Sequence, residues 1–547
     1  MSYVRPLLRF AAVCSAATLL ALPLAFLSAP GYAGTALIQL GSAPTEVGSD
    51  TYQNGTTIFT AYRAGIRPDG GADGVGYAAY NKQQGTWTNG SLGGITTAQG
   101  GAYGAVADVR VAYSLSGYNI WLIATLVTGG PGGTSAILVS RSIDDGRTFY
   151  KPVTAATGQL TGLWFACDFS FQTSCYLGYT VRDAGNVMRM RVSGSAGLSW
   201  GPEQGTADNA TGFGRRAVAQ TNGTVVVPYV ATTGELRAFR STNFGASWEP
   251  SVRISDVQHH TVAGGLNTNT LPSVDADYYG RLFVAWSDCR YRTGCAANDI
   301  VFSKSTDGTV WTAPARVPID PATGTADHFL PALGVDRTSY YPASTRLGLA
   351  YYSYPNAGCT ASTCQLQVGF VSSTNGGASW SAPVQLAGPM SLAWLTNTPQ
   401  GRTVGDAFST DVAWGGNAFP VVSVASAPVG GAFKQAMVVP AAGLAITGGA
   451  DVLVPPTAPT HLNAVALSSS SAGMSWFDND SNESGFAVER CRGVGCTNFA
   501  QIAVNGTDDS SFTDTGLTGH TSYSYRVRAF NAAGSSAYSN TATITTN

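Results

Sequence analysis

An all-β protein in two unequal parts is the fold that this 547-residue sequence predicts, and three observations indicate it. The charged residues are 26 Asp and 26 Arg against only 6 Glu and 4 Lys, so two residues typical of long helices are scarce. One turn motif recurs between Trp87 and Trp380, and segments of strand-like alternation separate its copies. A Pro-rich stretch, Val454 to Pro459, then introduces a second and shorter unit.

The charge content excludes several classes of function. Only 11% of the residues are charged, the net charge is −2, and the pI is about 6.2. A protein that binds nucleic acid or an anionic membrane surface carries a basic patch that this composition does not provide. Because 44% of the residues are hydrophobic, the chain is also too apolar to be intrinsically disordered.

The N-terminus has the pattern of a secretory signal peptide. Arg5 and Arg9 precede an apolar run that begins at Phe10 and ends near Ala29, and small residues follow up to Ala33. We therefore expect residues 1–33 to be removed and the remaining chain to be secreted, with no membrane span after cleavage. The alternative is a retained N-terminal membrane anchor.

Eight cysteines fall into four close pairs, which favours four local disulfides in an oxidising compartment. Metal ligation is the alternative, but no pair is a CxxC and the five histidines do not stand at ligand spacing, so we predict no metal site and no cofactor. The expected pairs are Cys167/Cys175, Cys289/Cys295, Cys359/Cys364 and Cys491/Cys496.

The recurring motif, S-x-D/N-x-G-x-S/T-aromatic, suits a tight hairpin turn. In the copy from Ser142 to Phe149, Asp144 can bond local backbone N–H groups, Gly146 supplies the positive φ, and the aromatic residue anchors the turn. The aromatic residues of six copies stand at positions 87, 149, 200, 248, 311 and 380. Such a period predicts repeated four-stranded units around an axis, a β-propeller of six or seven blades.

These turns resemble the Asp boxes, or BNR repeats, of the sialidase superfamily. The resemblance covers residues 34–450 and is closest to secreted bacterial proteins that contain the stretch Trp286-Ser-Asp288-Cys-Arg290 followed by Asn298-Asp299-Ile-Val. It implies a sialidase-like β-propeller. Asp boxes also occur in proteins that are not enzymes, so the motif predicts the fold more strongly than the activity.

After the Pro-rich linker, residues 451–459, the unit of residues 460–547 resembles a fibronectin type III domain, a β-sandwich. In that resemblance Trp476 is the core tryptophan and Tyr523 is the tyrosine of the corner. The acidic run that begins at Asp478 lacks the glycine of a calcium loop, and we interpret it as a turn of the sandwich.

The resemblance also implies a site: three arginines that bind a substrate carboxylate, an aspartate that acts as general acid, and a Tyr/Glu nucleophile pair. The arginines that follow strand-like segments are Arg63, Arg290 and Arg402. Arginine suits this role because its planar fork meets a carboxylate with two hydrogen bonds. An F-R-I-P motif, usual around the first arginine, is absent.

Carboxylates and aromatic residues near the ends of other strands complete the set of candidates. We expect Asp288, Asp327, Asp406 and Tyr351 to be catalytic and His328 to contact substrate, together with the three arginines. Paired carboxylates can act as acid and base where burial raises the pKa of one and leaves that of the other low. Asp288 and Arg290 also have a structural interpretation, because they can simply pair with each other.

Glutamates are rare in the larger part of the chain. Glu203 and Glu249 directly follow Asp-box turns and belong on the outer rim, so only Glu46 and Glu235 remain. The predicted function is a secreted sialidase-like glycoside hydrolase that acts on an extracellular polysaccharide or glycoconjugate. A non-catalytic carbohydrate-binding or adhesion propeller is the alternative, and the scarcity of glutamate favours it.

Overall fold

The computed structural model describes residues 26–27, 36–115, 119–168, 173–220, 222–268, 270–339, 344–406, 408–447, 455–479, 483–507, 509–531 and 534–547. The all-β prediction is confirmed, since 53% of the residues are in strands and 3% in helices. The predicted signal peptide, residues 1–33, lies outside these ranges except for strand β1 (Phe26–Leu27). Four residues of the predicted linker, 451–454, also lie outside them. In the described ranges, no helix is long and apolar enough to cross a membrane.

The first eight long strands form two antiparallel meanders. They are joined as one sheet only by the pair Ala72 and Val106. The first meander comprises β3 (Glu46–Gln53), β4 (Thr57–Ile66), β5 (Ala72–Asn81) and β6 (Thr86–Leu92), and the second comprises β7 (Ala105–Ser114), β8 (Ile120–Thr128), β9 (Ser135–Ser142) and β10 (Val153–Gly158).

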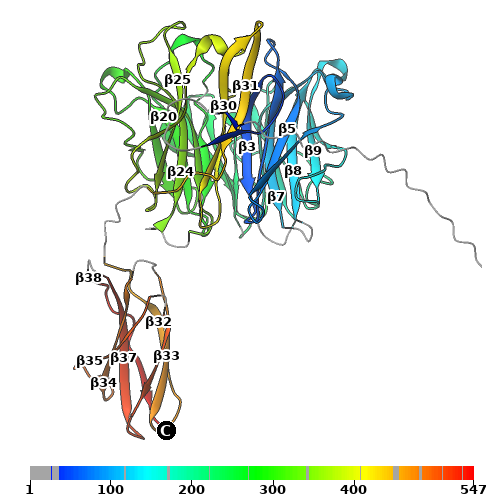
Figure 1. The fold of residues 1–547 in the computed structure, drawn as a ribbon. Coiled ribbons are helices and arrows are strands. Elements are labelled where there is room, and N and C mark those ends of the chain that lie inside the picture. The colour runs from blue at the N-terminus through cyan, green and yellow to red at the C-terminus, as the bar shows by residue number, and fades with distance from the viewer. Residues whose placement is uncertain are drawn as a thin grey trace, which may run out of the picture.

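Four further antiparallel sheets follow in chain order (Figure 1). Two contain β11 (Leu160–Cys167), β12 (Cys175–Val181) and β13 (Val187–Ser193), then β14 (Gly212–Gly214), β15 (Val218–Ala219), β16 (Val225–Ala231), β17 (Glu235–Ser241) and β18 (Val252–Asp256). The next two contain β19 (Ser273–Ala276), β20 (Leu282–Asp288), β21 (Asp299–Ser305) and β22 (Ala315–Arg316), then β23 (Asp327–Val335), β24 (Leu347–Tyr354), β25 (Gln365–Ser373) and β26 (Val384–Ser391).

The last sheet of the larger part contains strands from both ends of that part. Strand β2 (Leu37–Gln39) pairs antiparallel with β31 (Ala432–Pro440), which follows β30 (Ala418–Val429) and β29 (Ser409–Val412). The short elements are β27 (Asn397–Thr398), β28 (Gly401–Arg402) and the single 3-10 turns η1 (Thr97–Gln99), η2 (Pro131–Gly133), η3 (Ala263–Gly265), η4 (Thr293–Cys295) and η6 (Leu392–Trp394).

The first strands of successive sheets contact one another. Strand β3 contacts β7, β7 contacts β11, β11 contacts β14 and β15, and β15 contacts β19; β19 then contacts β23, β23 contacts β29, and β29 contacts β3 again. Buried aspartates tie some of these neighbours: Asp50 Oδ2 accepts from the backbone N–H of Val111 at 2.8 Å, and Asp275 Oδ2 from that of Val335 at 3.0 Å.

The predicted hairpin chemistry of the repeated turns is confirmed. In the first full copy, Asp144 Oδ1 accepts from the backbone N–H groups of Arg147 and Thr148 at 3.1 and 2.9 Å, and Gly146 has a φ of 78°. The aromatic residue of the turn, Phe149, packs against Tyr77 of the preceding meander, with ring centroids 4.9 Å apart. Each such turn therefore also attaches its sheet to the one before it.

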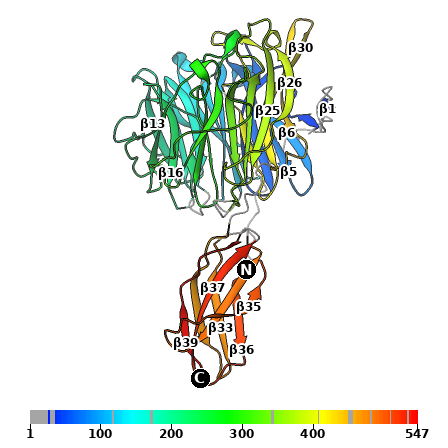
Figure 2. The same ribbon diagram turned by 90° about the vertical axis from the view of Figure 1, so that its left-hand side faces the viewer.

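The C-terminal part is a two-sheet sandwich, drawn in orange and red in Figures 1 and 2. Trp476 is buried and packs against Phe486, and the backbone N–H of Thr518 donates to Tyr523 Oη at 3.0 Å, as expected for the core and the corner. One sheet contains β32 (Thr460–Ala466), β33 (Ser471–Phe477) and β36 (Ser511–Thr515), and the other β34 (Gly485–Arg492), β35 (Ala500–Asn505), β37 (Ser522–Asn531), β38 (Gly534–Ser535) and β39 (Ala542–Thr545).

Candidate functional site

Asp288 and Arg290 form a closed ion pair. Arg290 Nη2 lies 2.7 Å and Nε 2.8 Å from the Asp288 carboxylate, which is fully buried and also accepts from Trp286 Nε1 at 3.0 Å. Arg290 donates in addition to Ser255 Oγ at 3.0 Å. Such a pair is the structural interpretation that the sequence allowed for these two residues. Because both charged groups are engaged with each other, they are less able to bind a ligand.

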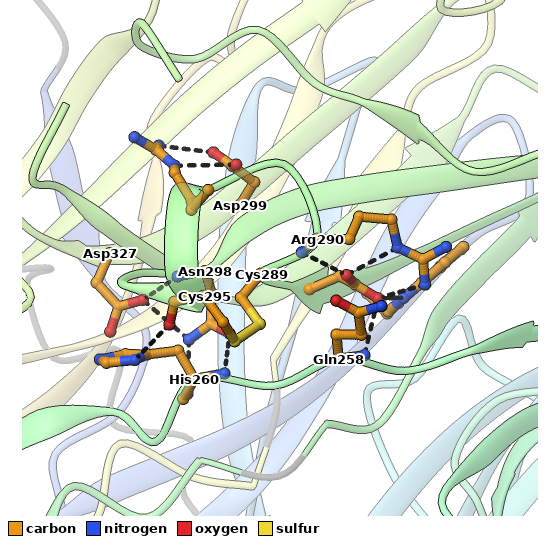
Figure 3. Close-up of a disulfide and its surroundings, with 11 residues drawn as sticks. Gln258, His260, Cys289, Arg290, Cys295, Asn298, Asp299 and Asp327 are labelled. Carbon is orange, nitrogen blue, oxygen red and sulfur yellow. Dashed lines mark hydrogen bonds and ion pairs between the residues drawn. A yellow bond between two sulfur atoms is a disulfide. The ribbon is translucent and has the colours of Figure 1, made fainter. Parts of the chain in front are cut away.

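Two other predicted residues, His328 and Tyr351, lie together, and Asp327 precedes His328 on β23 with its side chain on the other face of the sheet. Asp327, which stands beside the disulfide Cys289–Cys295 in Figure 3, accepts at Oδ1 from the backbone and the side chain of Asn298 at 2.7 and 2.9 Å, whereas its buried Oδ2 has no hydrogen-bond partner among the described residues. Burial raises the pKa of Asp327 and lowers that of His328 to about 4. The His328 ring meets the edge of Tyr351 with centroids 5.4 Å apart.

His328 also borders a cluster of acidic residues. Asp299, Asp320 and His328 each offer a ligand atom, and these atoms lie within 4.8 Å of one another. The two carboxylates, however, already bind guanidinium groups: Arg292 lies 2.6 Å from Asp299 and 2.5 Å from Asp320, and Arg316 lies 2.8 and 2.7 Å from them. Two arginines thus supply the positive charge that a cation would otherwise bring.

The remaining predicted residues lie elsewhere. Asn267 donates a side-chain hydrogen bond to Asp406 at 2.9 Å and its backbone N–H to the carbonyl of Arg402 at 2.7 Å. Arg402 and Asp406 therefore both contact the segment that contains Asn267. Arg63 is buried in β4 and donates to the carbonyl of Ala107 at 3.1 Å. Among the described residues, Arg63, Arg290 and Arg402 have no hydrogen-bond partner in common, and the carboxylate clamp stays a prediction.

All four predicted disulfides are present, and their sequence separations are between 5 and 8 residues. Cys167–Cys175 joins the ends of β11 and β12. Cys289–Cys295 and Cys359–Cys364 close the loops between β20 and β21 and between β24 and β25. The first of these loops carries Arg290 and Arg292, so the bond limits how far both guanidinium groups can move.

The fourth disulfide, Cys491–Cys496, belongs to the C-terminal sandwich. Cys491 is buried near the end of β34, whereas Cys496 is partly exposed in the turn that follows this strand. Neither cysteine lines the groove described next. Cys491 and Cys496 therefore hold a turn of the sandwich and take no part in a candidate site.

A groove that the sequence analysis did not identify lies between the first meander and the segment that follows β2. Its volume is about 690 Å³, within the range of roughly 300–1,000 Å³ that is typical of ligand pockets. Its described lining contains three amide side chains and includes no Arg or Lys. These residues are Gln39, Gly41, Ser42, Ala43, Pro44, Glu46, Tyr62, Ala64, Gly65, Asp73, Gly74, Gly76, Asn89, Gly90, Ser91 and Gln99.

The glycines open the space in which the polar groups of the groove meet. A Cβ atom on Gly41 would lie 2.0 Å from Glu46 Oε1 and 2.5 Å from Tyr62 Oη, so these two oxygens lie within 4.5 Å of each other, the sum of both distances. A Cβ on Gly76 would lie 2.3 Å from the Tyr62 ring, and one on Gly74 2.1 Å from the Gln99 amide. A side chain at any of these positions would therefore collide with Glu46, Tyr62 or Gln99.

Burial sets the protonation of Glu46. Its Oε1 accepts from the backbone N–H of Ala43 and its Oε2 from that of Met437, each at 3.0 Å. The side chain is 1% exposed, and this burial raises the pKa of Glu46 from 4.5 to about 7 although both hydrogen bonds lower it. Burial and the nearby Glu46 charge also raise the pKa of Tyr62.

A second carboxylate stands at the rim. Asp73 is about half exposed and lies 3.5 Å from Arg67. Glu46 pairs with Ala64 and Ala64 with Gly74, so the backbones of Glu46 and of the residue next to Asp73 are two strands apart, about 10 Å. The groove thus combines a buried carboxyl that is still partly protonated at neutral pH with an exposed carboxylate. The glutamate scarcity was the sequence signal for it, since Glu46 was one of two left.

Comparison with known proteins finds a match in the C-terminal part. Residues 457–545 match the model of the fibronectin type III domain. Exoglucanase B of Cellulomonas fimi is 44% identical over 94 residues, and an alpha-amylase of Niallia circulans is 34% identical over 93. Each match covers 17% of this chain, and the chain spans only 8% and 7% of the lengths of these relatives.

Solved structures match over the same share of the chain. An Fn3-like protein from Clostridium thermocellum is 29% identical, with 17% of this chain and 94% of that chain covered and a TM-score of 0.16. A structure described as a myokine is 27% identical, with 17% of this chain and 97% of that chain covered and a TM-score of 0.15.

Proposed function

We propose that the chain is a secreted glycoside hydrolase whose larger part is a seven-bladed, sialidase-like β-propeller and whose active site is the groove that contains Glu46. One observation carries the proposal: a buried carboxyl with a pKa of about 7 lines an open, glycine-rich groove beside a tyrosine hydroxyl. A carboxylic acid that keeps its proton near neutral pH is what general-acid catalysis requires.

The propeller is supported by the order of the strand contacts. The first strands of seven successive units, the two meanders and the five sheets that follow them, contact one another in turn, and the last of them, β29, contacts β3. Pairing of β2 with β31 places a strand from the N-terminal end on the last sheet, as closure of a ring requires. Of the six or seven blades that the sequence allowed, this arrangement favours seven.

In the proposed reaction, Glu46 donates its proton to the glycosidic oxygen as the bond to the anomeric carbon breaks. A water molecule attacks that carbon and loses a proton to Asp73. Hydrolysis by direct attack of water needs the two carboxyl groups roughly 6.5–9.5 Å apart, and the proposal requires the side chains of Glu46 and Asp73 to meet this separation. The Tyr62 hydroxyl, within 4.5 Å of the acid, is placed to bind a sugar hydroxyl.

The lining of the groove favours an uncharged sugar. It contains no arginine or lysine among the residues described, and Arg67 at the rim already pairs with Asp69 and Asp73, so a sugar carboxylate would meet Glu46 and Asp73 without an unpaired cation in the lining. The amides of Gln39, Asn89 and Gln99 can instead exchange hydrogen bonds with sugar hydroxyls, and Gln99 Oε1 is buried without a partner in the described chain. We therefore favour neutral glycosides over sialosides as substrates.

Export is supported by the N-terminal sequence and by the four disulfides, which persist in oxidising compartments. The two relatives that match the fibronectin domain carry the names of carbohydrate-degrading enzymes. Since that match is confined to the C-terminal domain, it is consistent with a glycan substrate but does not concern the groove.

A panel of aryl glycosides tests the proposal. We expect the protein to cleave at least one neutral glycoside and no sialoside, with Glu46→Gln lowering kcat by at least 100-fold. The rate should fall as the pH rises through about 7, because Glu46 then loses the proton that it must donate. Glu235→Gln, outside the groove, is the matched control and should keep the full rate. Absence of turnover on every glycoside, or turnover that Glu46→Gln leaves unchanged, would refute the proposal.

A further inference from the structure

A second pocket, of about 440 Å³, lies at the other end of β3 from Glu46. We call it the aromatic pocket, and its lining is Tyr52, Val218, Ala219, Gln220, Asn222, Asp275, Ala276, Asp277, Tyr278, Tyr279, Gly280, Arg337, Thr338 and Trp414. Tyr52 and Glu46 are six residues apart on the same strand, which corresponds to about 20 Å. The two cavities are therefore separate.

Three large aromatic side chains at this pocket remain exposed to solvent. Tyr278 is 53%, Tyr279 64% and Trp414 42% exposed, and they come from turns of two different sheets. A folded protein usually buries most of such rings, and clusters of exposed ones typically mark a binding site. Their flat faces can stack against the C–H face of a sugar ring.

Hydrogen bonds fix both turns. Asp277 Oδ1 accepts from the backbone N–H groups of Tyr279 and Arg281 at 3.1 and 3.0 Å, and Gln220 donates to the carbonyl of Gly280 at 2.8 Å. In the other turn, the backbone N–H of the residue after Trp414 donates to Asp336 Oδ2 at 3.0 Å. The backbones that carry the rings are thus held before a ligand arrives, which lowers the entropic cost of binding.

The charges at the aromatic pocket are already paired. Arg337 lies 3.0 Å from Asp275 and stacks on the Tyr52 ring at 4.1 Å, and Asp277 pairs with Arg281. Each of these carboxylates and the Arg337 guanidinium thus already has an ion-pair partner, although Nε of Arg337 makes no hydrogen bond among the described residues. This argues against a quaternary ammonium ion, which aromatic cages otherwise bind, and against an acidic sugar.

We propose that the aromatic pocket binds an uncharged sugar unit of a polysaccharide and holds the chain on the protein independently of the groove. The binding requires no hydrolysis. The two proposals can therefore fail separately: a defect in the aromatic pocket abolishes polysaccharide binding but not cleavage of a small aryl glycoside, and Glu46→Gln does the reverse.

Affinity electrophoresis and calorimetry with soluble polysaccharides test this site. The probes are dextran, galactomannan and mixed-linkage β-glucan as neutral polymers, alginate as an acidic polymer, and choline as a cation. We expect at least one neutral polymer to bind. Trp414→Ala and Tyr279→Ala should each weaken that binding at least tenfold, and both substitutions are made so that a folding defect in one does not decide the result.

Tyr150→Ala is the matched control, because Tyr150 is 59% exposed and is not part of the pocket. It should leave binding unchanged, and thermal unfolding should show all three variants to be folded. The proposal is overturned if no neutral polymer binds, if alginate or choline binds in place of the neutral polymers, or if the Tyr150 variant loses as much affinity as the pocket variants.

Discussion

Replacing Glu46 by Gln should change both the pH dependence of the unfolding free energy and the catalytic activity. The pKa of Glu46 rises from 4.5 to about 7 on folding. Since each pH unit of difference corresponds to about 1.4 kcal/mol, ionisation of this carboxyl costs the folded state about 3 kcal/mol. Below pH 4.5 the group is protonated in both states, so the unfolding free energy carries no ionisation penalty. As the pH rises from 4.5 through about 7, this contribution to the unfolding free energy is lost.

In the Glu46→Gln variant this pH dependence disappears. The amide can accept only one of the two N–H groups that reach Glu46, from Ala43 and Met437, and the lost bond costs about 1–3 kcal/mol at every pH. The informative quantity is therefore the change in unfolding free energy between pH 5 and pH 8. We expect the wild-type protein to lose about 3 kcal/mol more over this interval than the variant does.

Guanidinium unfolding of both proteins at several pH values, followed by tryptophan fluorescence, measures the difference. Turnover is measured on the same samples, and the variant should lack it at every pH. If the unfolding free energies of the two proteins changed with pH in the same way, the pKa of Glu46 would not be raised by burial. That result would also remove the physical reason for choosing it as the general acid.

Three further predictions concern the groove, an ion pair and a disulfide. Gly41→Ala places a Cβ 2.0 Å from Glu46 Oε1, so kcat on an aryl glycoside should fall about 100-fold, whereas Gly93→Ala, with open space around it, should not change the rate. Arg290→Ala leaves its buried aspartate partner without a cation and should lower the unfolding free energy by about 3 kcal/mol with turnover retained; unchanged stability would contradict this. Replacing Cys167 and Cys175 by Ser removes the bond that closes a loop of 8 residues and should lower the unfolding free energy by about 2–3 kcal/mol. Thermal unfolding measures this loss, and an unchanged Tm would contradict the predicted stabilisation.

Features with a local cause could be predicted from the sequence. The turn that contains Gly146 follows from side-chain and backbone chemistry within eight residues, and the disulfides join cysteines at most 8 residues apart. The roles of Trp476 and Tyr523 follow from a domain pattern that the family comparison supports. In each of these cases, the residues that determine the structure are close together in the chain.

The site depends on contacts that the sequence does not display. Glu46 is enclosed by segments that are distant in the sequence. The backbone N–H of Met437, 391 residues further on, and that of Ala43 both donate to its carboxyl group. Arg290 and Arg402 both follow strand-like segments, but one turns back to Asp288 and the other joins the segment at Asn267. Strand ends could be recognised from the sequence, whereas the direction of each side chain depended on its neighbours in space.

Pairing of β2 with β31 determines when the larger part can complete its folding. Leu37 pairs with Pro440, about 400 residues later in the chain, so the last sheet lacks its outer strand until almost the whole region has been synthesised and has folded. After synthesis and until residues 37–39 dock, β31 presents an unpaired edge that can associate with the same edge of another copy. Conditions that delay docking of residues 37–39 should therefore favour aggregation, even when every other sheet has formed.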